Sequence, residues 1–410
     1  MSETVVIVGG GQAAIQTADS LRKDGFEGRL VMVGDESHPP YQRPPLSKKF
    51  LSGELPLERL GIKPPAFYDT HHVELRLNRH VEGLDRARQE LALSDGERLG
   101  YDQLVLATGT TPRKITVPGA DLGGVHYLRS IADVDRIRAE LGKARRVVIV
   151  GGGYIGLEAA ATCRSLGHEV DVLEMTDRVM NRVVAPGVSA FFTGEHLRAG
   201  VRVHVGVLVS AFAPRADDSR RVGAVETLGG QSYLADLVIV GIGVLPNIGL
   251  AASAGLACEN GIAVDAHCRT SDPLIYSAGD CCSQPSVRYG RRVRLESVDN
   301  AFEQAKTVAF NLRGGSAVHD KIPWFWSDQY DLKLLIVGLN VDYDLALLRG
   351  DPASRSFACC YLRGRELLSI DCVNNIKDYM AAKKLIAERV HCDLAKLADP
   401  AIALKDTVIG

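Results

Sequence analysis

The seven residues VVIVGGG occur twice in this chain, at residues 5–11 and 147–153. Each copy is an apolar run that ends in a glycine turn and is followed by residues with helical spacing. Glycine allows a tight bend, close approach of the backbone to a pyrophosphate, and close packing of the helix on the strand. The helix that follows adds unpaired N–H groups and the positive end of its dipole. Each copy therefore predicts a site for the phosphates of one dinucleotide.

An acidic residue after the next strand completes each pattern, because its carboxylate can bind a ribose hydroxyl. After the first loop, Asp35 or Glu36 follows the apolar run RLVMVG. After the second loop, Glu174 ends the run EVDVLE. The first loop has alanine at the third fingerprint position, and the second loop is complete. Two such sites indicate two cofactors with electrons passing between them, and the natural pair is a flavin and a nicotinamide.

The elements around the loops are predicted from continuous apolar runs, which are typical of strands buried on both faces of a parallel sheet. Strand, glycine turn, helix and strand are written twice, which predicts an α/β protein with two Rossmann-like dinucleotide-binding domains. After about residue 320, both tryptophans, two strand-like runs joined by RGRE and the amphipathic run DYMAAKKLIAERV predict a C-terminal α+β domain. The polar run PRADDSRR at residues 214–221 predicts a hairpin loop inside the second domain.

The composition is that of a globular protein of two or three domains, with 410 residues, 46% hydrophobic, 24% charged and a formal net charge of -2. This balance argues against nucleic acid or a membrane as a partner, and no apolar run is long enough to span a bilayer. A strand that begins at Thr4 leaves no room for a signal peptide, so we expect a cytoplasmic protein. The nine cysteines form no C-x-x-C pair and are expected to be free, mostly buried thiols. The histidines show no metal-ligand spacing, so no metal site is expected.

Further motifs follow one another in a fixed order along the chain. They are VVIVGGGQAA (5–14), VGDESHPPYQRPPLSKKFL (33–51), LVLATGTTPR (104–113), VVIVGGGYIGLEAAA (147–161), VIVGIGVLPN (238–247), TSDPLIYSAGDC (270–281), RLESVDNAFEQA (294–305) and PWFWSDQY (323–330). With these motifs the sequence resembles the two-dinucleotide-domain flavoprotein reductases of glutathione-reductase-like fold. It is most similar to the ferredoxin reductases of bacterial oxygenase systems, the family of putidaredoxin reductase and of the aromatic-ring dioxygenase reductases. The resemblance covers nearly the whole chain.

The resemblance implies FAD in the first site and NADH in the second. It divides the chain into a discontinuous FAD-binding domain at 1–113 and 241–320, a NAD-binding domain at 114–240 and a C-terminal domain at 321–410. The residues implied for FAD are Gly9, Gly11, Ala13, Asp35, Arg43, Lys48, Val81, Ala107, Thr108, Gly109, Arg129, Gly279, Asp280, Val298 and Trp326. The residues implied for NADH are Gly151, Gly152, Tyr154, Ile155, Gly156, Glu158, Glu174, Arg182, Gly241, Ile242 and Gly243.

Two of these residues are implied to form a charge pair beside the reacting rings. By resemblance, Glu158 lies near the nicotinamide ribose and pairs with Lys48, so that each charge offsets the desolvation of the other. Alternatively, both are solvated surface side chains. Glu174 would bind the adenosine ribose and repel the extra phosphate of NADPH, which favours NADH. Arg178 and Arg182 follow nearby and could hold phosphate charge, so NADPH is less favoured but stays open.

The implied activity is that of an NADH:ferredoxin oxidoreductase, which takes hydride onto FAD and passes single electrons to a [2Fe–2S] ferredoxin. The ferredoxin would serve an oxygenase of the Rieske or cytochrome P450 type. No protein nucleophile is needed, because the cofactor carries the reaction. Alternatives are an NADH oxidase or a flavoprotein like apoptosis-inducing factor and, in another class, a non-enzymatic binding protein stabilised by FAD.

The cysteine positions argue against a disulfide or peroxide reductase. Those enzymes need a reactive thiol beside the flavin, and the segment LSKKFLSG (46–53) holds no cysteine. A basic cluster, Arg288, Arg291, Arg292 and Arg294, precedes the LESV segment and could steer an acidic ferredoxin. Equally, it could be a solvated basic turn. Reversing the charges of Arg291 and Arg292 tests this hypothesis, because unchanged ferredoxin reduction at low salt would exclude steering.

Overall fold

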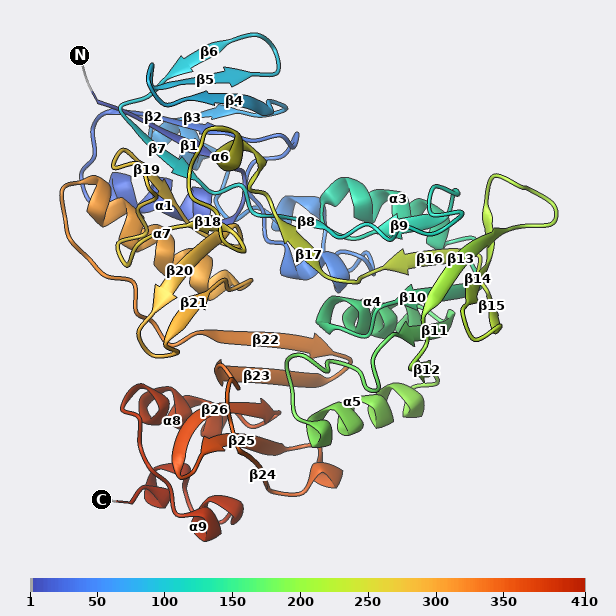
Figure 1. The fold of residues 1–410 in the computed structure, drawn as a ribbon. Helices are drawn as coiled ribbons and strands as arrows, with labels where there is room; N and C mark the ends of the chain where they lie inside the picture. The colour runs from blue at the N-terminus through green and yellow to red at the C-terminus, as the bar shows by residue number, and fades with distance from the viewer. Residues whose placement is uncertain (1–2, 410) are drawn as a thin grey trace. The chain divides into compact units, whose positions relative to one another are not determined.

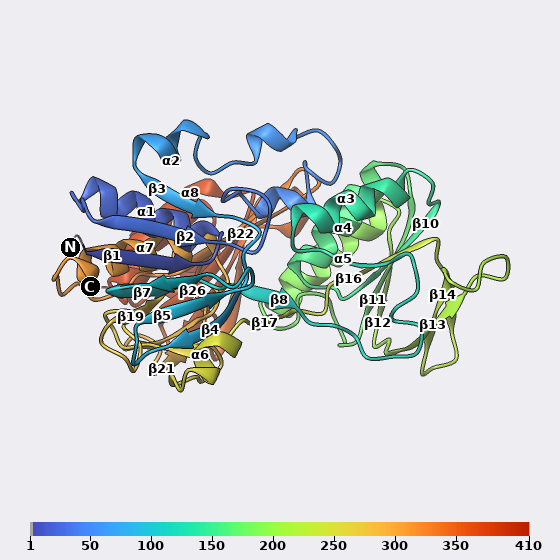
Figure 2. The same cartoon turned by 90° about the horizontal axis from the view of Figure 1, so that it is seen from above.

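The computed structural model describes residues 3–409 and divides into two compact units, whose elements are shown in Figures 1 and 2. The first unit comprises the chain up to Gln42, Leu57–Thr111 and Leu245–Pro323. The second comprises Arg43–Pro56, Pro112–Val244 and the chain from Trp324 onward. This division groups the expected NAD-binding and C-terminal domains in one unit. The finer domain boundaries drawn from the sequence stay a prediction.

A five-stranded parallel sheet forms the centre of the first unit. From edge to edge its strands are β19 (Ile275–Ser277), β7 (Gln103–Leu106), β1 (Thr4–Val8), β2 (Arg29–Val33) and β3 (Val73–Arg76). Side chains alternate across this sheet, so Val5 and Ile7 pack with the helices α1 (Gln12–Lys23) and α7 (Val298–Leu312). Val6 and Val8 pack on the opposite face. Burial on both faces explains why the sequence of β1 is apolar throughout.

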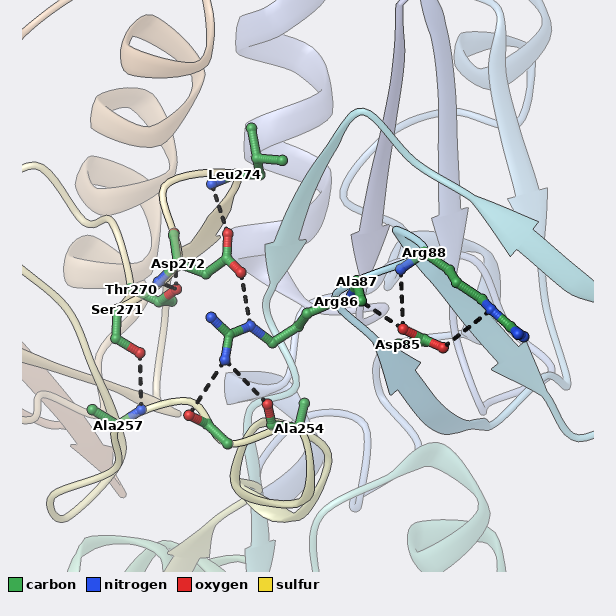
Figure 3. A network of polar contacts seen from close by, with 11 residues as sticks. Asp85, Arg86, Ala87, Arg88, Ala254, Ala257, Thr270, Ser271, Asp272 and Leu274 are labelled. Atoms are coloured by element: carbon green, nitrogen blue, oxygen red, sulfur yellow. Dashed lines mark hydrogen bonds and ion pairs between the residues drawn. The ribbon is translucent and has the colours of Figure 1, made fainter.

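That opposite face is covered by a small antiparallel sheet of β4 (Val81–Asp85), β5 (Glu90–Leu93) and β6 (Arg98–Gly100) and by α6 (Gly249–Ser253). Arg86, just after β4, joins these parts, as Figure 3 shows. Its Nε atom donates to Asp272 at 2.7 Å, and its Nη1 atom donates to the carbonyl oxygens of Ala254 and Gly255. One guanidinium therefore ties the turn after β4 to the end of α6 and to the loop before β19.

The second unit contains another five-stranded parallel sheet. Its strands are β12 (Arg202–Val205), β11 (Glu169–Glu174), β10 (Arg146–Val150), β16 (Leu237–Val240) and β9 (Val125–Tyr127), with the helices α3 (Ile131–Leu141), α4 (Tyr154–Ser165) and α5 (Pro186–Arg198). An antiparallel sheet of β13 (Val209–Pro214), β14 (Val222–Thr227) and β15 (Ser232–Leu234) packs on it. The loop between β13 and β14 is the predicted hairpin loop, which is thus confirmed.

The C-terminal part of the second unit is an antiparallel sheet with two helices. Its strands, in sheet order, are β22 (Trp324–Gln329), β23 (Leu332–Gly338), β26 (Glu366–Val373), β25 (Phe357–Arg363) and β24 (Leu345–Arg349), and its helices are α8 (Ile376–Ala387) and α9 (Leu394–Ala398). The RGRE turn joins β25 to β26 as predicted. The helix α8 begins earlier than the run DYMAAKKLIAERV, because the Asn375 side chain caps it by accepting from the Asp378 N–H.

Shorter elements complete both units. They are η1 (Pro44–Ser47), η2 (Leu57–Arg59), α2 (Ala66–Thr70), β8 (Thr110–Pro112), β17 (Val244–Pro246), β18 (Ile262–Ala263), β20 (Cys282–Ser286), β21 (Arg291–Val293), η3 (Pro352–Ser354) and η4 (Leu404–Thr407). All nine cysteines are free thiols, and all but Cys258 are buried. Burial raises the pKa of Cys163 and of Cys359 to about 12. Within residues 3–409, no helix is long and apolar enough to cross a membrane.

A buried ion pair holds the C-terminal part together and generates a stability prediction. The Arg349 Nε atom lies 2.8 Å from Asp378 Oδ2, and both side chains are less than a tenth exposed. The Nη atoms of Arg349 donate to the carbonyl oxygens of Leu397, Asp399 and Ile402. One buried cation therefore organises the segment between α9 and η4.

Arg349→Met will lower the free energy of unfolding by about 3–5 kcal/mol, because it leaves the Asp378 charge buried without its partner. The double variant Arg349→Met/Asp378→Asn will recover part of this loss. Urea unfolding followed by tryptophan fluorescence measures both, since Trp324 and Trp326 lie in the same unit. A loss below about 1 kcal/mol for the single variant would show that the Arg349–Asp378 pair does not stabilise the C-terminal part as a buried ion pair.

Candidate functional site

The first glycine loop joins β1 to α1 and is closed by a second turn of the chain. Gly9 has a φ of 137°, and a Cβ atom there would lie 2.1 Å from the carbonyl oxygen of Ala107. Only glycine allows this approach. Gly11, which precedes the first residue of α1, has an extended backbone, and a Cβ there would meet no atom within 4 Å. The first turn of α1 holds no acidic residue. Open space at a helix N-terminus suits a phosphate group.

The SAGD turn reaches the same helix end. Gly279 has a φ of 86°, and a Cβ there would lie 3.1 Å from the Cβ of Ala13. The Gly279 N–H donates to Oε1 of the fully buried Gln304, at 2.8 Å. This hydrogen bond holds the turn, and with it Asp280, over the start of α1. Val298 is the first residue of α7, which also begins here.

The turn Ala107–Gly109 is held by Asn247. Thr108 Oγ1 donates to the Asn247 carbonyl oxygen at 2.7 Å, and the Asn247 side chain donates back to the Thr108 carbonyl at 2.8 Å. The Asn247 N–H donates to the Gly109 carbonyl at 2.9 Å. Two of these three hydrogen bonds use the Asn247 backbone, and the bond from its side-chain amide is the one that requires asparagine at the end of GVLPN.

The two candidate ribose acids differ in position. The N–H of Gly9 donates to Val33 and that of Gly151 donates to Leu173, so Gly34 and Glu174 occupy equivalent sites. Asp35 follows one residue later and is exposed, while Glu36 accepts a hydrogen bond from the Tyr41 hydroxyl at 2.5 Å. Val81, the first residue of β4, is buried in the core below. The acid of the first loop is thus offset by at least one residue from that of the second.

The second glycine loop, between β10 and α4, repeats the geometry of the first. Gly151 has a φ of 108°, and a Cβ there would lie 2.4 Å from the carbonyl oxygen of Gly241. A Cβ at Gly156 would lie 2.1 Å from the carbonyl oxygen of Gly151. A Cβ at Gly153 would meet no atom within 4 Å. The loop is again tight where the chain packs and open where a phosphate would lie.

Glu174 is bound to this loop from the end of β11. Its Oε2 atom accepts from the Gly152 N–H at 2.6 Å, and its Oε1 atom accepts from the N–H and hydroxyl of Thr176. The carboxylate is therefore fixed beside the loop. Gly243, after Ile242, has a φ of 97°, and a Cβ there would lie 3.7 Å from the Arg182 guanidinium. Ile155, at the start of α4, is 44% exposed.

Lys48 and Glu158 form an ion pair within the second unit, in which the carboxylate is buried and the lysine is partly exposed. The Lys48 Nζ atom lies 3.0 Å from Glu158 Oε2, and Ser47 donates to the same oxygen at 2.6 Å. Ser327 donates to Glu158 Oε1 at 2.8 Å. Thr162, one turn along α4, donates to the Ser47 carbonyl at 2.8 Å and so holds the lysine loop on the helix. The buried carboxylate thus has one cation and two hydroxyl donors.

The remaining expected residues also lie in the second unit. Arg43 Nη1 donates to the Arg129 carbonyl oxygen at 2.8 Å, which brings these two together. Trp326 stacks near Trp324, with ring centroids 5.4 Å apart. Tyr154 begins α4, and burial together with the charges of Asp371 and Glu158 raises the pKa of its hydroxyl.

The structure thus brings the expected NADH residues together in the second unit and distributes the FAD residues over both. The FAD residues in the first unit are Gly9, Gly11, Ala13, Asp35, Val81, Ala107, Thr108, Gly109, Gly279, Asp280 and Val298. Those in the second unit are Arg43, Lys48, Arg129 and Trp326. Both loops fit a dinucleotide phosphate, because each leaves an open cradle that a Cβ atom would fill. Their roles remain proposals.

Two arginines of the basic cluster make hydrogen bonds or ion pairs within the first unit. Arg292 donates to the carbonyl oxygens of Val264 and Ser283, and Arg294 lies 2.7 Å from Glu296. Arg291 is exposed. A charge reversal at Arg292 would therefore disturb the fold, and Arg291 is the cleaner probe of steering. Among residues 3–409, no three His, Cys, Asp or Glu side chains are grouped to hold a metal ion.

Sequence reasoning missed the residues that hold the assigned ones in place. Ser47, Asn247, Gln304 and Ser327 make hydrogen bonds to a site turn or to Glu158. Each lies inside or next to a quoted motif, which was the available signal. Their partners are distant in sequence, so the motifs alone could not assign the contacts.

Comparisons with known proteins agree with this geometry. The family model for pyridine nucleotide-disulphide oxidoreductases matches residues 3–305, and the Reductase C-terminal model matches residues 324–408. The chain is 42% identical over 402 residues to the 5,5'-dehydrodivanillate O-demethylase ferredoxin reductase subunit of Sphingobium sp., covering 98% of this chain and 97% of that protein.

Two solved structures are similar over the whole chain. A ferredoxin reductase from Rhodopseudomonas palustris has 41% identity and a TM-score of 0.95, covering 99% of this chain and 100% of the other. The reductase of a covalent putidaredoxin reductase–putidaredoxin complex has 41% identity and a TM-score of 0.95, covering 99% and 98%. These similarities confirm the predicted glutathione-reductase-like fold class. The chain therefore belongs to the pyridine nucleotide-disulphide oxidoreductase family, and within it to the ferredoxin reductases of oxygenase systems, a family whose cofactors are FAD and NAD(P)H.

Proposed function

We propose that this chain is the reductase component of a multicomponent oxygenase system, which takes hydride from NADH onto FAD and passes single electrons to a [2Fe–2S] ferredoxin. The observation that carries the proposal is the pair of open phosphate cradles, one in each unit, at Gly11 and Gly153. Bound FAD would supply the chemistry, because a flavin accepts electrons in pairs and releases them singly. The ferredoxin partner is supported by the similarity to the reductase of the putidaredoxin complex.

The residues of this chain would bind and align the two nucleotides. The first loop and the SAGD turn would hold FAD, and the second loop would hold the NADH pyrophosphate at the start of α4. Glu158 lies on the same helix, one turn further along, and would stand beside the nicotinamide ribose with Lys48 as its counter-charge. Alignment of this kind is the main contribution that a protein makes to hydride transfer.

We also propose a cytoplasmic location and a preference for NADH. Nine free thiols suit a reducing compartment. The Glu174 carboxylate is held at the loop by the Gly152 N–H, so its charge would stand where NADPH carries its additional phosphate.

An anaerobic titration tests the proposed function. NADH should bleach the absorbance of the FAD-loaded protein, and oxidised ferredoxin should restore it while two ferredoxins are reduced for each NADH. Reoxidation by oxygen but by no ferredoxin would favour an NADH oxidase. Bleaching without turnover to any acceptor would favour a binding protein, and failure to bind FAD would refute the proposal.

Gly153→Ala will weaken NADH binding and leave the fold intact, because the added Cβ atom enters empty space that the pyrophosphate would fill. We expect a rise of at least about tenfold in the dissociation constant for NADH, with unchanged FAD content and melting temperature. Gly194→Ala in α5 is the matched control, since a Cβ there also meets no atom within 4 Å. Equal NADH binding by both variants would contradict the assignment of the loop.

Glu174→Ser will shift the nucleotide preference toward NADPH, because it removes the negative charge beside the loop. The ratio of kcat/KM for NADPH to that for NADH should rise by about tenfold or more. Glu169→Ser, at the other end of β11, is the control and should leave the ratio unchanged. A ratio that is the same in both variants would show that Glu174 does not select the nucleotide.

A further inference from the structure

A chain of four hydrogen bonds ends at the Glu158 carboxylate. Tyr330 bonds to Nδ1 of His196 at 3.0 Å, and Nε2 of His196 bonds to Oε1 of Gln329 at 2.9 Å. Gln329 Nε2 donates to Ser327 Oγ at 3.2 Å, and Ser327 donates to Glu158 Oε1 at 2.8 Å. All five residues belong to the second unit. The chain connects α5, β22 and α4, which are distant in sequence.

The links of this chain are buried. His196 and Ser327 have no exposed surface, Gln329 is 1% exposed and Glu158 is 5% exposed. Ser327 and Gln329 are two residues apart on β22, so strand geometry places both side chains on one face. Buried polar groups of this kind are stable only when each finds a partner. The hydrogen bonds therefore form a fully connected network rather than a set of surface contacts.

The negative charge of Glu158 determines the direction of every bond in the chain. A carboxylate only accepts, so the Ser327 hydroxyl must donate to it, and the Ser327 oxygen must then accept from the amide NH₂ of Gln329. The amide oxygen of Gln329 is therefore turned toward His196.

The same logic extends to the end of the chain. Because the amide oxygen accepts, His196 must donate from Nε2. Burial lowers the pKa of His196, which favours the neutral ring and leaves Nδ1 free to accept from the Tyr330 hydroxyl. Burial raises the pKa of Tyr330, so that hydroxyl keeps its proton. One charge thus fixes an amide orientation and a histidine tautomer.

The chain is built to position a charge and not to conduct protons. An amide donates from nitrogen and accepts at oxygen, so Gln329 could pass a proton on only as its imidic acid. The donors of the hydrogen-bond chain instead all point toward Glu158. The other oxygen of this carboxylate, Oε2, contacts Lys48 and accepts from Ser47. Ser327 therefore holds Glu158 Oε1, the carboxylate oxygen that is not paired with Lys48.

We propose that Ser327, Gln329 and His196 are positioning residues that hold the Glu158 carboxylate, and through it Lys48, in the orientation used for hydride transfer. The inference rests on the proposed function and extends it to β22 and α5, which carry none of the residues that we expect to bind NADH. A positioning role predicts a loss in the rate of hydride transfer that exceeds any loss in NADH binding.

Single-turnover bleaching of the FAD-loaded protein by NADH tests this role. Ser327→Ala should lower the saturating rate by roughly tenfold, with the NADH dissociation constant changed by less than about threefold. Ser327→Thr, which keeps the hydroxyl, should restore most of the rate. Ser369→Ala is the matched control, because Ser369 is a fully buried serine of the same sheet that donates to the Val337 carbonyl and not to this chain.

The tautomer of His196 gives a second readout that does not depend on activity. In protein labelled with isotopic histidine, the NMR signal of His196 is identified by its loss in His196→Asn. We expect a neutral ring protonated at Nε2 at neutral pH, and loss of this fixed tautomer in Gln329→Leu. A ring protonated at Nδ1 would overturn the inference, because the amide would then be reversed and Ser327 could not donate to Glu158.

The kinetic outcomes separate the two proposals. If NADH fails to bleach the wild-type flavin, the proposed function is wrong and the positioning role falls with it. If the wild type is bleached and Ser327→Ala behaves like Ser369→Ala, the positioning role alone is wrong. A selective rate loss in Ser327→Ala that Ser327→Thr reverses, together with the Nε2 tautomer, would establish it.

Discussion

Two contacts between backbone and backbone are the constraint on which both candidate nucleotide sites depend. The carbonyl oxygens of Ala107 and Gly241 come so close to Gly9 and Gly151 that a Cβ atom would overlap them. This approach sets the positive φ of each glycine and directs the chain into the following helix. A Cβ atom at Gly11 or at Gly153, just before each helix, would meet no atom within 4 Å. Open space thus follows two residues after each tightly packed glycine, and we propose that a phosphate group lies there.

The buried charge of Glu158 is the second organising feature. It accounts for the presence in the second unit of segments that are distant in sequence. Glu158 lies on α4, and its carboxylate receives donors from Lys48 and Ser47 in the segment Arg43–Pro56 and from Ser327 on β22. A buried carboxylate with fewer donors would be costly, because its desolvation would not be compensated. The C-terminal sheet therefore contributes directly to the surroundings of Glu158. It supplies a hydroxyl to a residue that stands one turn beyond the phosphate cradle.

Much of this could be predicted from the sequence, and the limit has a physical reason. Apolar runs of four to six residues predicted the parallel strands, because burial on both faces selects Val, Ile and Leu. The glycine loops were predicted because no other residue meets their geometry. The network around Glu158 could not be predicted, because its bonds join residues far apart in sequence. Ser327 bonds to Glu158 and His196 bonds to Gln329, each across more than a hundred residues. A serine or glutamine in a strand carries no sign of its partner, and only the fold brings the two together.

The repeated VVIVGGG shows where a motif stops being informative. The two copies are identical in sequence and nearly identical in geometry, yet the position after the paired strand holds Gly34 in one and Glu174 in the other. Glu174 accepts from the Gly152 N–H, which fixes its carboxylate against the loop. At Gly34 there is no side chain to do so, and the backbones of Gly10 and Gly34 approach each other instead. The acidic residues of the first loop, Asp35 and Glu36, come one and two residues after Gly34. The two loops therefore differ in where their acidic side chains lie, although the geometry of their glycines is nearly the same.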